Sequence, residues 1–239
     1  MSKIVGFDYH IKLHHLDYIA REAQKNDVKT MYRKLEEFLQ QDIAGPSSRK
    51  KSTTMLMRIW YLVKEEYKGL QAEAFALLDQ VSERERLVLH WGMTLLAYRF
   101  FYDMAQEIGN AFTLQTEVAS ELLGRKMKKL YGDKRRVEIA TSAVLMSMKA
   151  WGVLDSVKHG RYRLQEKKEI LDHRLKLWLA KVVIKVSACQ AMPLEMITSA
   201  GSVFPFQFEL KLNDLEDSGL SVQRQGLDLL MVSLSSLPK

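Results

Sequence analysis

The sequence predicts a mainly α-helical protein with an N-terminal helical bundle, a central winged helix-turn-helix and a small α/β tail. Apolar residues recur at helical spacing through most of residues 10–189. The 239 residues include only 12 glycines and four prolines, whereas all-β folds usually need more of both for their turns. Within residues 116–166, two helical stretches separated by a glycine precede two short strands, the order typical of a winged helix-turn-helix.

Composition excludes several classes of protein. The single cysteine, Cys189, rules out an intramolecular disulfide framework and a cysteine-based zinc site, and we expect its thiol to be buried and inert. The longest apolar stretch, at residues 88–98, is far shorter than the ~20 residues of a membrane-spanning helix. The N-terminus lacks the apolar core of a signal peptide. We therefore expect a soluble cytoplasmic protein without a membrane partner.

Residues 1–115 are expected to form the helical bundle, beginning with two helices between His10 and Gln41, the second capped by Asp27. A Gly-Pro pair followed by serines then predicts a basic loop at residues 45–53. Its cations are available to contact DNA phosphates if the loop leads into a DNA-reading helix. A mobile basic loop without a ligand is the alternative. The cations are Arg49, Lys50 and Lys51.

The centre of the bundle is expected at residues 87–93, which are apolar almost all round. Ser82 and Glu85 have the spacing of a capping box ahead of this helix. His90 lies within the apolar run, and we interpret it as a core histidine with satisfied hydrogen bonds.

The winged helix-turn-helix is expected at residues 116–166. Thr116 is placed to cap its first helix, Gly132 to end that helix and Asp133 to cap the second. Gly152 ends the second helix, and two short strands follow in the pattern of a hairpin. The apolar stripe of the second helix, with spacings of three, four, four and three, consists of Val137, Ala140, Val144, Met148 and Trp151.

Residues 167–239 are expected to hold one long helix and a β-containing tail. The helix is predicted over residues 168–189, and Pro193 suits the first turn of a short helix after it. Strands are predicted where helical spacing gives way to short apolar runs, at residues 203–210, 220–224 and 228–233.

The positive charge is concentrated in one segment. Residues 116–168 carry thirteen Lys and Arg against six Asp and Glu, an excess equal to the net charge of the whole chain, +7. A localised basic footprint on a winged helix indicates DNA, with the second helix in the major groove and the hairpin beside the backbone. We expect double-stranded DNA to be contacted by Arg125, Lys128, Lys129, Lys134, Arg135, Arg136, Ser142, Lys149, Lys158, His159, Arg161 and Arg163, with Arg49, Lys50 and Lys51 as a second site.

A protein–protein scaffold is the first alternative function. Ile139 and Met146 lie on the outward side of the predicted second helix, which suggests that another element covers part of it. The Phe-Pro-Phe sequence at residues 204–206 is a further docking candidate if it is exposed.

Patterns for metal binding or catalysis are weak. His10 and His14 are four residues apart and would share a helix face, but no third strong ligand lies nearby, so we expect no metal site. Glu209 and Lys211 on a predicted strand fit the acid-x-Lys ending of one class of metal-dependent nucleases, although the required upstream acid is not identifiable. A nuclease is the second alternative. We otherwise expect a non-catalytic protein without a cofactor.

The run from Leu87 to Asp155 resembles a group of uncharacterised bacterial proteins that are associated with anti-phage defence islands. The Phe-Pro-Phe sequence and residues 224–228, RQGLD, are similar to their tail. More loosely, the order of basic Ser/Thr loop, helical middle and winged helix is similar to the small accessory A protein of BREX phage-exclusion systems. That family implies binding of double-stranded DNA without known enzymatic activity. The resemblance therefore implies a DNA-binding accessory protein with a protein partner in a defence complex.

Overall fold

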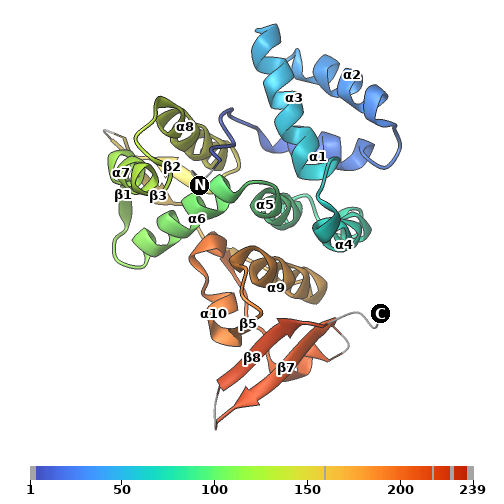
Figure 1. The fold of residues 1–239 in the computed structure, drawn as a ribbon, viewed down its shortest axis with the longest axis vertical. Coiled ribbons are helices and arrows are strands. Elements are labelled where there is room, and N and C mark those ends of the chain that lie inside the picture. The colour runs from blue at the N-terminus through green and yellow to red at the C-terminus, as the bar shows by residue number, and fades with distance from the viewer. Residues whose placement is uncertain (1–3, 159, 217, 227–228, 236–239) are drawn as a thin grey trace.

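The computed structural model describes residues 4–158, 160–216, 218–226 and 229–235, which form a mainly α-helical fold (Figure 1). Ten α-helices and three small sheets fall within these ranges. None of these helices is long and apolar enough to cross a lipid bilayer. One hydrophobic core extends through the chain from Val5 to Val232, so the helices and sheets pack around shared apolar side chains.

The N-terminal part of the fold, blue to teal in Figure 1, consists of α1 (Leu13–Glu22), α2 (Val28–Leu39), α3 (Pro46–Trp60) and α4 (Lys68–Leu78). Asp27 caps α2 as predicted, because its side chain accepts hydrogen bonds from the backbone N–H groups of Lys29 and Thr30.

The basic loop predicted at residues 45–53 is wrong for most of its length. Helix α3 begins at Pro46, so Arg49, Lys50 and Lys51 lie in its first two turns. Proline fits the start of a helix because its fixed φ suits the helix and its missing N–H needs no partner there. A Gly-Pro pair is also common in loops, which is why the pattern pointed to one.

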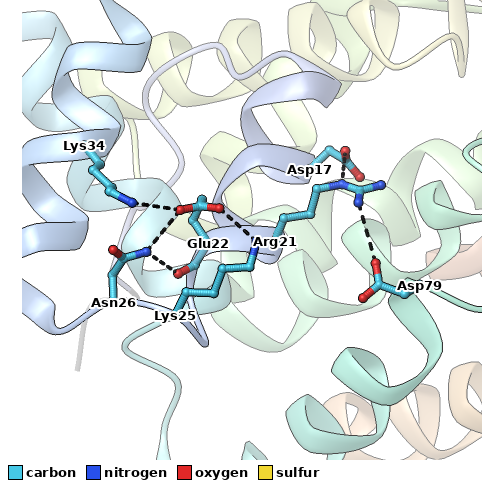
Figure 2. Close-up of polar contacts among 7 residues, drawn as sticks. All are labelled: Asp17, Arg21, Glu22, Lys25, Asn26, Lys34 and Asp79. Atoms are coloured by element: carbon cyan, nitrogen blue, oxygen red, sulfur yellow. Dashed lines mark hydrogen bonds and ion pairs between the residues drawn. The ribbon is translucent and has the colours of Figure 1, made fainter.

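A polar network fastens α1 to its neighbours (Figure 2). Glu22, the last residue of α1, accepts a hydrogen bond from Lys34 of α2 at 3.0 Å. Arg21 donates to Asp17 at 2.8 Å and reaches the carboxylate of Asp79, just after α4, at 3.6 Å. These contacts hold α1 between α2 and the end of α4.

Helix α5 (Arg86–Ala97) lies at the centre of the fold, and its side chains are buried from residue 87 to residue 96, as the apolar run predicted. Ser82 and Glu85 form the expected reciprocal hydrogen bonds in the turn before it. Helices α6 (Arg99–Phe112) and α9 (His173–Ser187) pack against α5.

The segment from α6 to residue 164 has the order helix, strand, helix, turn, helix, strand, strand. After α6 come β1 (Glu117–Ala119), α7 (Ser120–Tyr131), α8 (Arg135–Ala150), β2 (Leu154–Ser156) and β3 (Arg161–Leu164). The strands form one antiparallel sheet in the order β1-β3-β2, with Val118 opposite Tyr162. Gly132 and Gly152 have positive φ and end α7 and α8 as predicted.

Two details of this segment differ from the sequence prediction. Thr116 does not cap a helix, because β1 comes first and α7 begins only at Ser120. The strand is three residues long and its partner β3 is distant in sequence, so spacing along the chain did not indicate it. Asp133 does not cap α8, whose N-cap is Lys134, but forms an ion pair with Lys128 at 2.9 Å.

The long helix of the C-terminal part, α9, is shorter than the predicted range of residues 168–189 at both of its ends. The short strand β4 (Lys168–Glu169) comes first, and α9 begins later, capped by Asp172. Of the predicted strands, those at 220–224 and 228–233 correspond to β7 (Leu220–Gln225) and β8 (Leu229–Leu234), with residues 227–228 outside the described part. The other elements are β5 (Ala191–Pro193), α10 (Leu194–Thr198) and β6 (Phe206–Gln207), and the last sheet has the order β5-β8-β7.

The strand predicted at residues 203–210 is wrong for most of its length, because only Phe206 and Gln207 pair as a strand, with β4. Phe204 and Phe206 are buried, and their rings lie edge-on to Trp91 of α5 at 5.6 and 5.7 Å. The Phe-Pro-Phe sequence is therefore part of the core and is not an exposed docking sequence.

Gly109→Ala is expected to destabilise the protein by about 1–3 kcal/mol. A Cβ on Gly109 of α6 would lie 2.2 Å from the carbonyl oxygen of Gly201, and backbone cannot rotate away as a side chain can. Urea unfolding measures the loss. Gly124→Ala on α7 is the matched control, since an added Cβ there meets nothing within 4 Å. Equal stability of the two variants would contradict the close contact.

Candidate nucleic-acid interface

Helix α8 has a buried side and an outward side. On the outward side, Arg135, Ser142 and Lys149 are exposed and seven residues apart, so they follow one line along the helix for about 20 Å. The predicted apolar stripe forms the buried side, and it consists of Val137, Ala140, Val144, Met148 and Trp151. The sequence pattern thus oriented this helix correctly.

Apolar side chains lie beside this line of polar residues. Ile139 is 47% exposed and Met146 is 48% exposed, so no other described element covers them, contrary to the sequence expectation. Side chains of this kind can contact the methyl group of thymine in the major groove, or a protein partner.

Five exposed cations of α7, α8, the turn between these helices and the β2–β3 turn form no ion pair with a described residue. Lys129 lies near the end of α7, Lys134 and Arg135 at the start of α8, Lys149 near its end, and Lys158 between β2 and β3. A cation without a carboxylate partner can neutralise a phosphate without first breaking an ion pair. These five are named below the unpaired cations.

Most other predicted DNA contacts are already partnered. Four arginines have a carboxylate within 2.5–3.8 Å: Arg125 with Glu121, Arg136 with Asp8, Arg161 with Glu117 and Arg163 with Asp155. Exposed ion pairs of this kind contribute only about 0–1 kcal/mol, so a phosphate can compete for the arginine. The pairs nevertheless reduce the local positive charge that a duplex would meet.

Lys128 neutralises the one acid of α8. Its Nζ lies 2.5 Å from Glu138 and 2.9 Å from Asp133. The hydrogen bonds to Glu138 and Asp133 raise the pKa of Lys128 to about 12. Because the charge of Glu138 is balanced in this way, the outward side of α8 keeps its positive charge.

The N-terminal segment before α1, dark blue in Figure 1, contacts the buried side of α8. The backbone N–H of Ile11 donates to Ser147 Oγ at 2.9 Å, and Trp151 Nε1 donates to the Ile11 carbonyl at 2.9 Å. Asp8 accepts from Arg136 at 3.2 Å. Sequence reasoning missed this contact, because no local pattern links the start of the chain to a helix more than a hundred residues later.

The cations of α3 form a separate group. Arg49 donates to the carbonyl oxygens of Ile43 and Ala44, so it stabilises the turn after α2 and is only partly exposed. Lys51 is exposed and lies 5.4 Å from the centre of the Tyr9 ring. Tyr9 follows Asp8, so this group touches the same N-terminal segment as Arg136.

The predicted contact residues therefore gather in two places. Those of α7, α8 and the β2–β3 hairpin belong to one segment, and Arg49, Lys50 and Lys51 begin α3. His159 lies outside the described residues.

The histidines near the N-terminus do not pair as the sequence suggested. Helix α1 begins at Leu13, so His10 precedes it and cannot share a helix face with His14. His14 instead lies beside His15, and both Nε2 atoms reach Asp42 Oδ2, at 2.6 and 2.8 Å. Among the described residues, these three form the one group of metal-ligand type within 4.8 Å of one another.

Hydrogen bonding argues against a metal at this group. The backbone N–H of Lys12 donates to His15 Nδ1 at 3.2 Å, so the ring carries its proton on Nε2 and donates it to Asp42. A metal ion would need that nitrogen without its proton. The ammonium of Lys12 also pairs with Asp42. The chemistry of the group is that of a hydrogen-bonded cluster.

Stability is expected to fall as the pH is lowered from 7 to 5. Burial lowers the pKa of His15 to about 4 and also lowers that of His90, from 6.5 in the unfolded chain. The unfolded state therefore binds more protons below pH 6.5, and stability is lost as the pH falls. Each histidine contributes up to about 1.4 kcal/mol per pH unit.

Urea unfolding at pH 7, 6 and 5 measures this dependence, because most carboxylates titrate only below this range. In His90→Leu, the free energy of unfolding is expected to fall less steeply with decreasing pH, because the unfolded state then takes up about one proton fewer. Stability that is constant from pH 7 to 5 would contradict the burial of these rings.

The other residues singled out in the sequence lie in environments that differ from those expected. His90 is buried, but neither ring nitrogen has a hydrogen-bond partner among the described residues, and its Nε2 lies 3.7 Å from Asp17. Cys189 is exposed rather than buried. Glu209 and Lys211 lie in a loop after β6, so the strand-borne acid-x-Lys pattern of a nuclease is wrong.

Comparisons with protein-family models, curated proteins and solved structures give no significant match.

Proposed function

We propose that residues 99–164 form a winged helix-turn-helix that binds double-stranded DNA, with α8 as the recognition helix and the β2–β3 hairpin as the wing. The order α6, β1, α7, α8, β2, β3 supports this proposal. So does the turn of residues 132–134, which joins α7 to α8. In such domains the second helix of the motif enters the major groove.

The observation that carries the proposal is the charge along the outward side of α8. Arg135 and Lys149 stand unpaired at its two ends with Ser142 between them, and the only acid, Glu138, is neutralised by Lys128. Lys129 and Lys134 add charge where the N-terminus of α8 also favours a phosphate.

Most of the expected contacts carry no sequence information, because lysines meet phosphates as point charges. Arg135 is the one arginine among the five unpaired cations, and its guanidinium can form a bidentate bond to guanine. The protein is therefore expected to bind many duplexes with similar affinity. We propose a non-catalytic accessory role, and on the sequence resemblance alone we propose a phage-defence complex as its setting.

Binding to labelled 20-base-pair duplexes of two unrelated sequences tests the proposal. Fluorescence anisotropy between 50 and 200 mM salt is expected to show a log–log slope of about −4.5, if all five unpaired cations contact phosphates. The two duplexes are expected to bind alike. Absence of binding, or an affinity independent of salt, would contradict it.

A protein–protein scaffold remains the second candidate function. The exposed Ile139 and Met146 favour it, because they place apolar area on the outward side of α8. Duplex binding that is unaffected by Ile139→Ser and Met146→Ser, together with loss of binding in variants of the unpaired cations, would favour DNA over the scaffold.

A further inference from the structure

A groove of about 620 Å³ lies between the end of α3, the α5–α6 junction, the end of α9 and the N-terminal segment. Its floor is apolar and includes Met55, Ile59 and Leu96, which are buried. Its volume falls in the range of sites that bind small organic groups. The proposed duplex surface on α8 does not account for this groove.

Cations outnumber acids among the described residues that line the groove. The one acid is Asp8, and the cations are Arg58, Lys64, Arg99, Arg136 and Lys185. Three of these cations already have a carboxylate partner: Arg99 pairs with Asp103, Arg136 with Asp8 and Lys185 with Glu66. Arg58 and Lys64 are exposed and form no ion pair with any residue that the structure describes. A groove with this balance is complementary to an anion.

The C-terminus of a helix carries a partial negative charge that disfavours an anion, and at the end of α9 this charge is reduced by Arg99. Arg99 donates to the carbonyl oxygen of Val186 at 3.0 Å, so it satisfies one of the last carbonyls of α9. Arg99 also pairs with Asp103 at 2.9 Å, which fixes the position of its guanidinium.

Aromatic rings lie among these cations. The Nζ atoms of Lys64 and Lys185 lie 5.7 and 5.8 Å from the centre of the Tyr67 ring. The guanidinium of Arg99 lies 4.4 Å from the centre of the Tyr102 ring. Tyrosine rings and a planar guanidinium are surfaces on which nucleic-acid bases stack.

We propose that this groove binds an unpaired strand of nucleic acid. A basic groove that also offers aromatic rings is typical of single-strand binding, whereas a duplex keeps its bases inside and presents only phosphates at such a site. An acidic peptide would use the cations but not the rings. The inference rests on the proposed function in one respect: Arg136 lies both in this groove and in the first turn of α8, so a strand leaving the duplex on α8 enters the groove there.

Binding of labelled dT12 and of a blunt duplex to the same variants tests the inference. Arg58→Glu with Lys64→Glu is expected to weaken dT12 binding at least about tenfold and to flatten its log–log salt slope by about 1.4, the value for two phosphate contacts of a single strand. Duplex binding is expected to stay within about twofold of wild type. Tyr67→Leu is expected to weaken dT12 binding by about 5- to 150-fold with an unchanged salt slope.

Lys29→Glu with Arg224→Glu is the matched control, because it changes the net charge equally at exposed positions outside the groove. Equal dT12 affinity of the two double variants would overturn the inference. So would equal loss of dT12 and duplex binding in the groove variant. Competition by dTMP or by oligoglutamate at the concentration of dT12 would overturn it in favour of a nucleotide or an acidic peptide.

The two proposals fail separately. If wild type binds dT12 but no duplex, and the groove variant loses dT12, then the proposed duplex function fails and the groove inference stands. If duplex binds and dT12 does not, the groove inference alone is overturned.

Discussion

Trp151→Ala is expected to destabilise the protein by about 3–5 kcal/mol, the largest effect of any single substitution considered. The indole is 3% exposed, and its ring lies against Phe7, Trp91 and Phe101 at centroid distances of 6.3, 6.1 and 5.6 Å. Its Nε1 also donates to the carbonyl of Ile11. The substitution therefore leaves a cavity and an unpaired carbonyl at one position.

Urea unfolding of wild type, Trp151→Ala and Trp151→Phe measures the loss. Trp151→Phe keeps an aromatic ring but removes the hydrogen bond, so an intermediate loss is expected. Val157→Ala, at a site 37% exposed, is the control and should change stability little. If Trp151→Ala unfolds at the urea concentration of wild type, the buried stripe of α8 is misassigned.

Replacing three unpaired cations together is expected to weaken duplex binding roughly 100-fold near physiological salt. The triple variant is Lys134→Ala with Arg135→Ala and Lys149→Ala, and each lost phosphate contact removes about 0.9 from the log–log salt slope. All three side chains are exposed, so the fold should be unaffected. Anisotropy over a salt series measures both the affinity and the slope.

A second triple variant provides the comparison. Arg125→Ala with Arg161→Ala and Arg163→Ala removes the same charge from the same segment, but each of these arginines already has a carboxylate partner. It is expected to weaken binding less and to flatten the slope less. Equal losses in the two triple variants would contradict the distinction between paired and unpaired cations.

Local signals in the sequence predicted the helices best. Asp27 caps α2 because its side chain reaches N–H groups two and three residues later, and the stripe ending at Trp151 is buried because helical spacing brings it to one face. The errors arise where distant segments meet. Strand β1 exists through its pairing with β3, and Asp133 pairs with Lys128 instead of capping α8.

The sequence indicates the segment that carries the candidate interface, but it does not indicate the ion pairs within that segment. Counting residues located the basic segment, yet it did not show that Arg161 pairs with Glu117 of the neighbouring strand, or that Lys128 neutralises Glu138. The N-terminal segment was missed altogether, because the bond from Ile11 to Ser147 joins parts of the chain without a shared pattern. The same is true of the groove that includes Arg58.

Cross-linking from the middle of α8 tests the DNA-binding proposal most directly. With the exposed native thiol removed by Cys189→Ser, a photo-cross-linker on Ser142→Cys would stand between Arg135 and Lys149. On a bound duplex it is expected to cross-link to bases, whereas the same reagent on Lys29→Cys of α2 is expected to give no cross-link. A duplex that binds without cross-linking to position 142, or cross-links equally at position 29, would contradict recognition by α8.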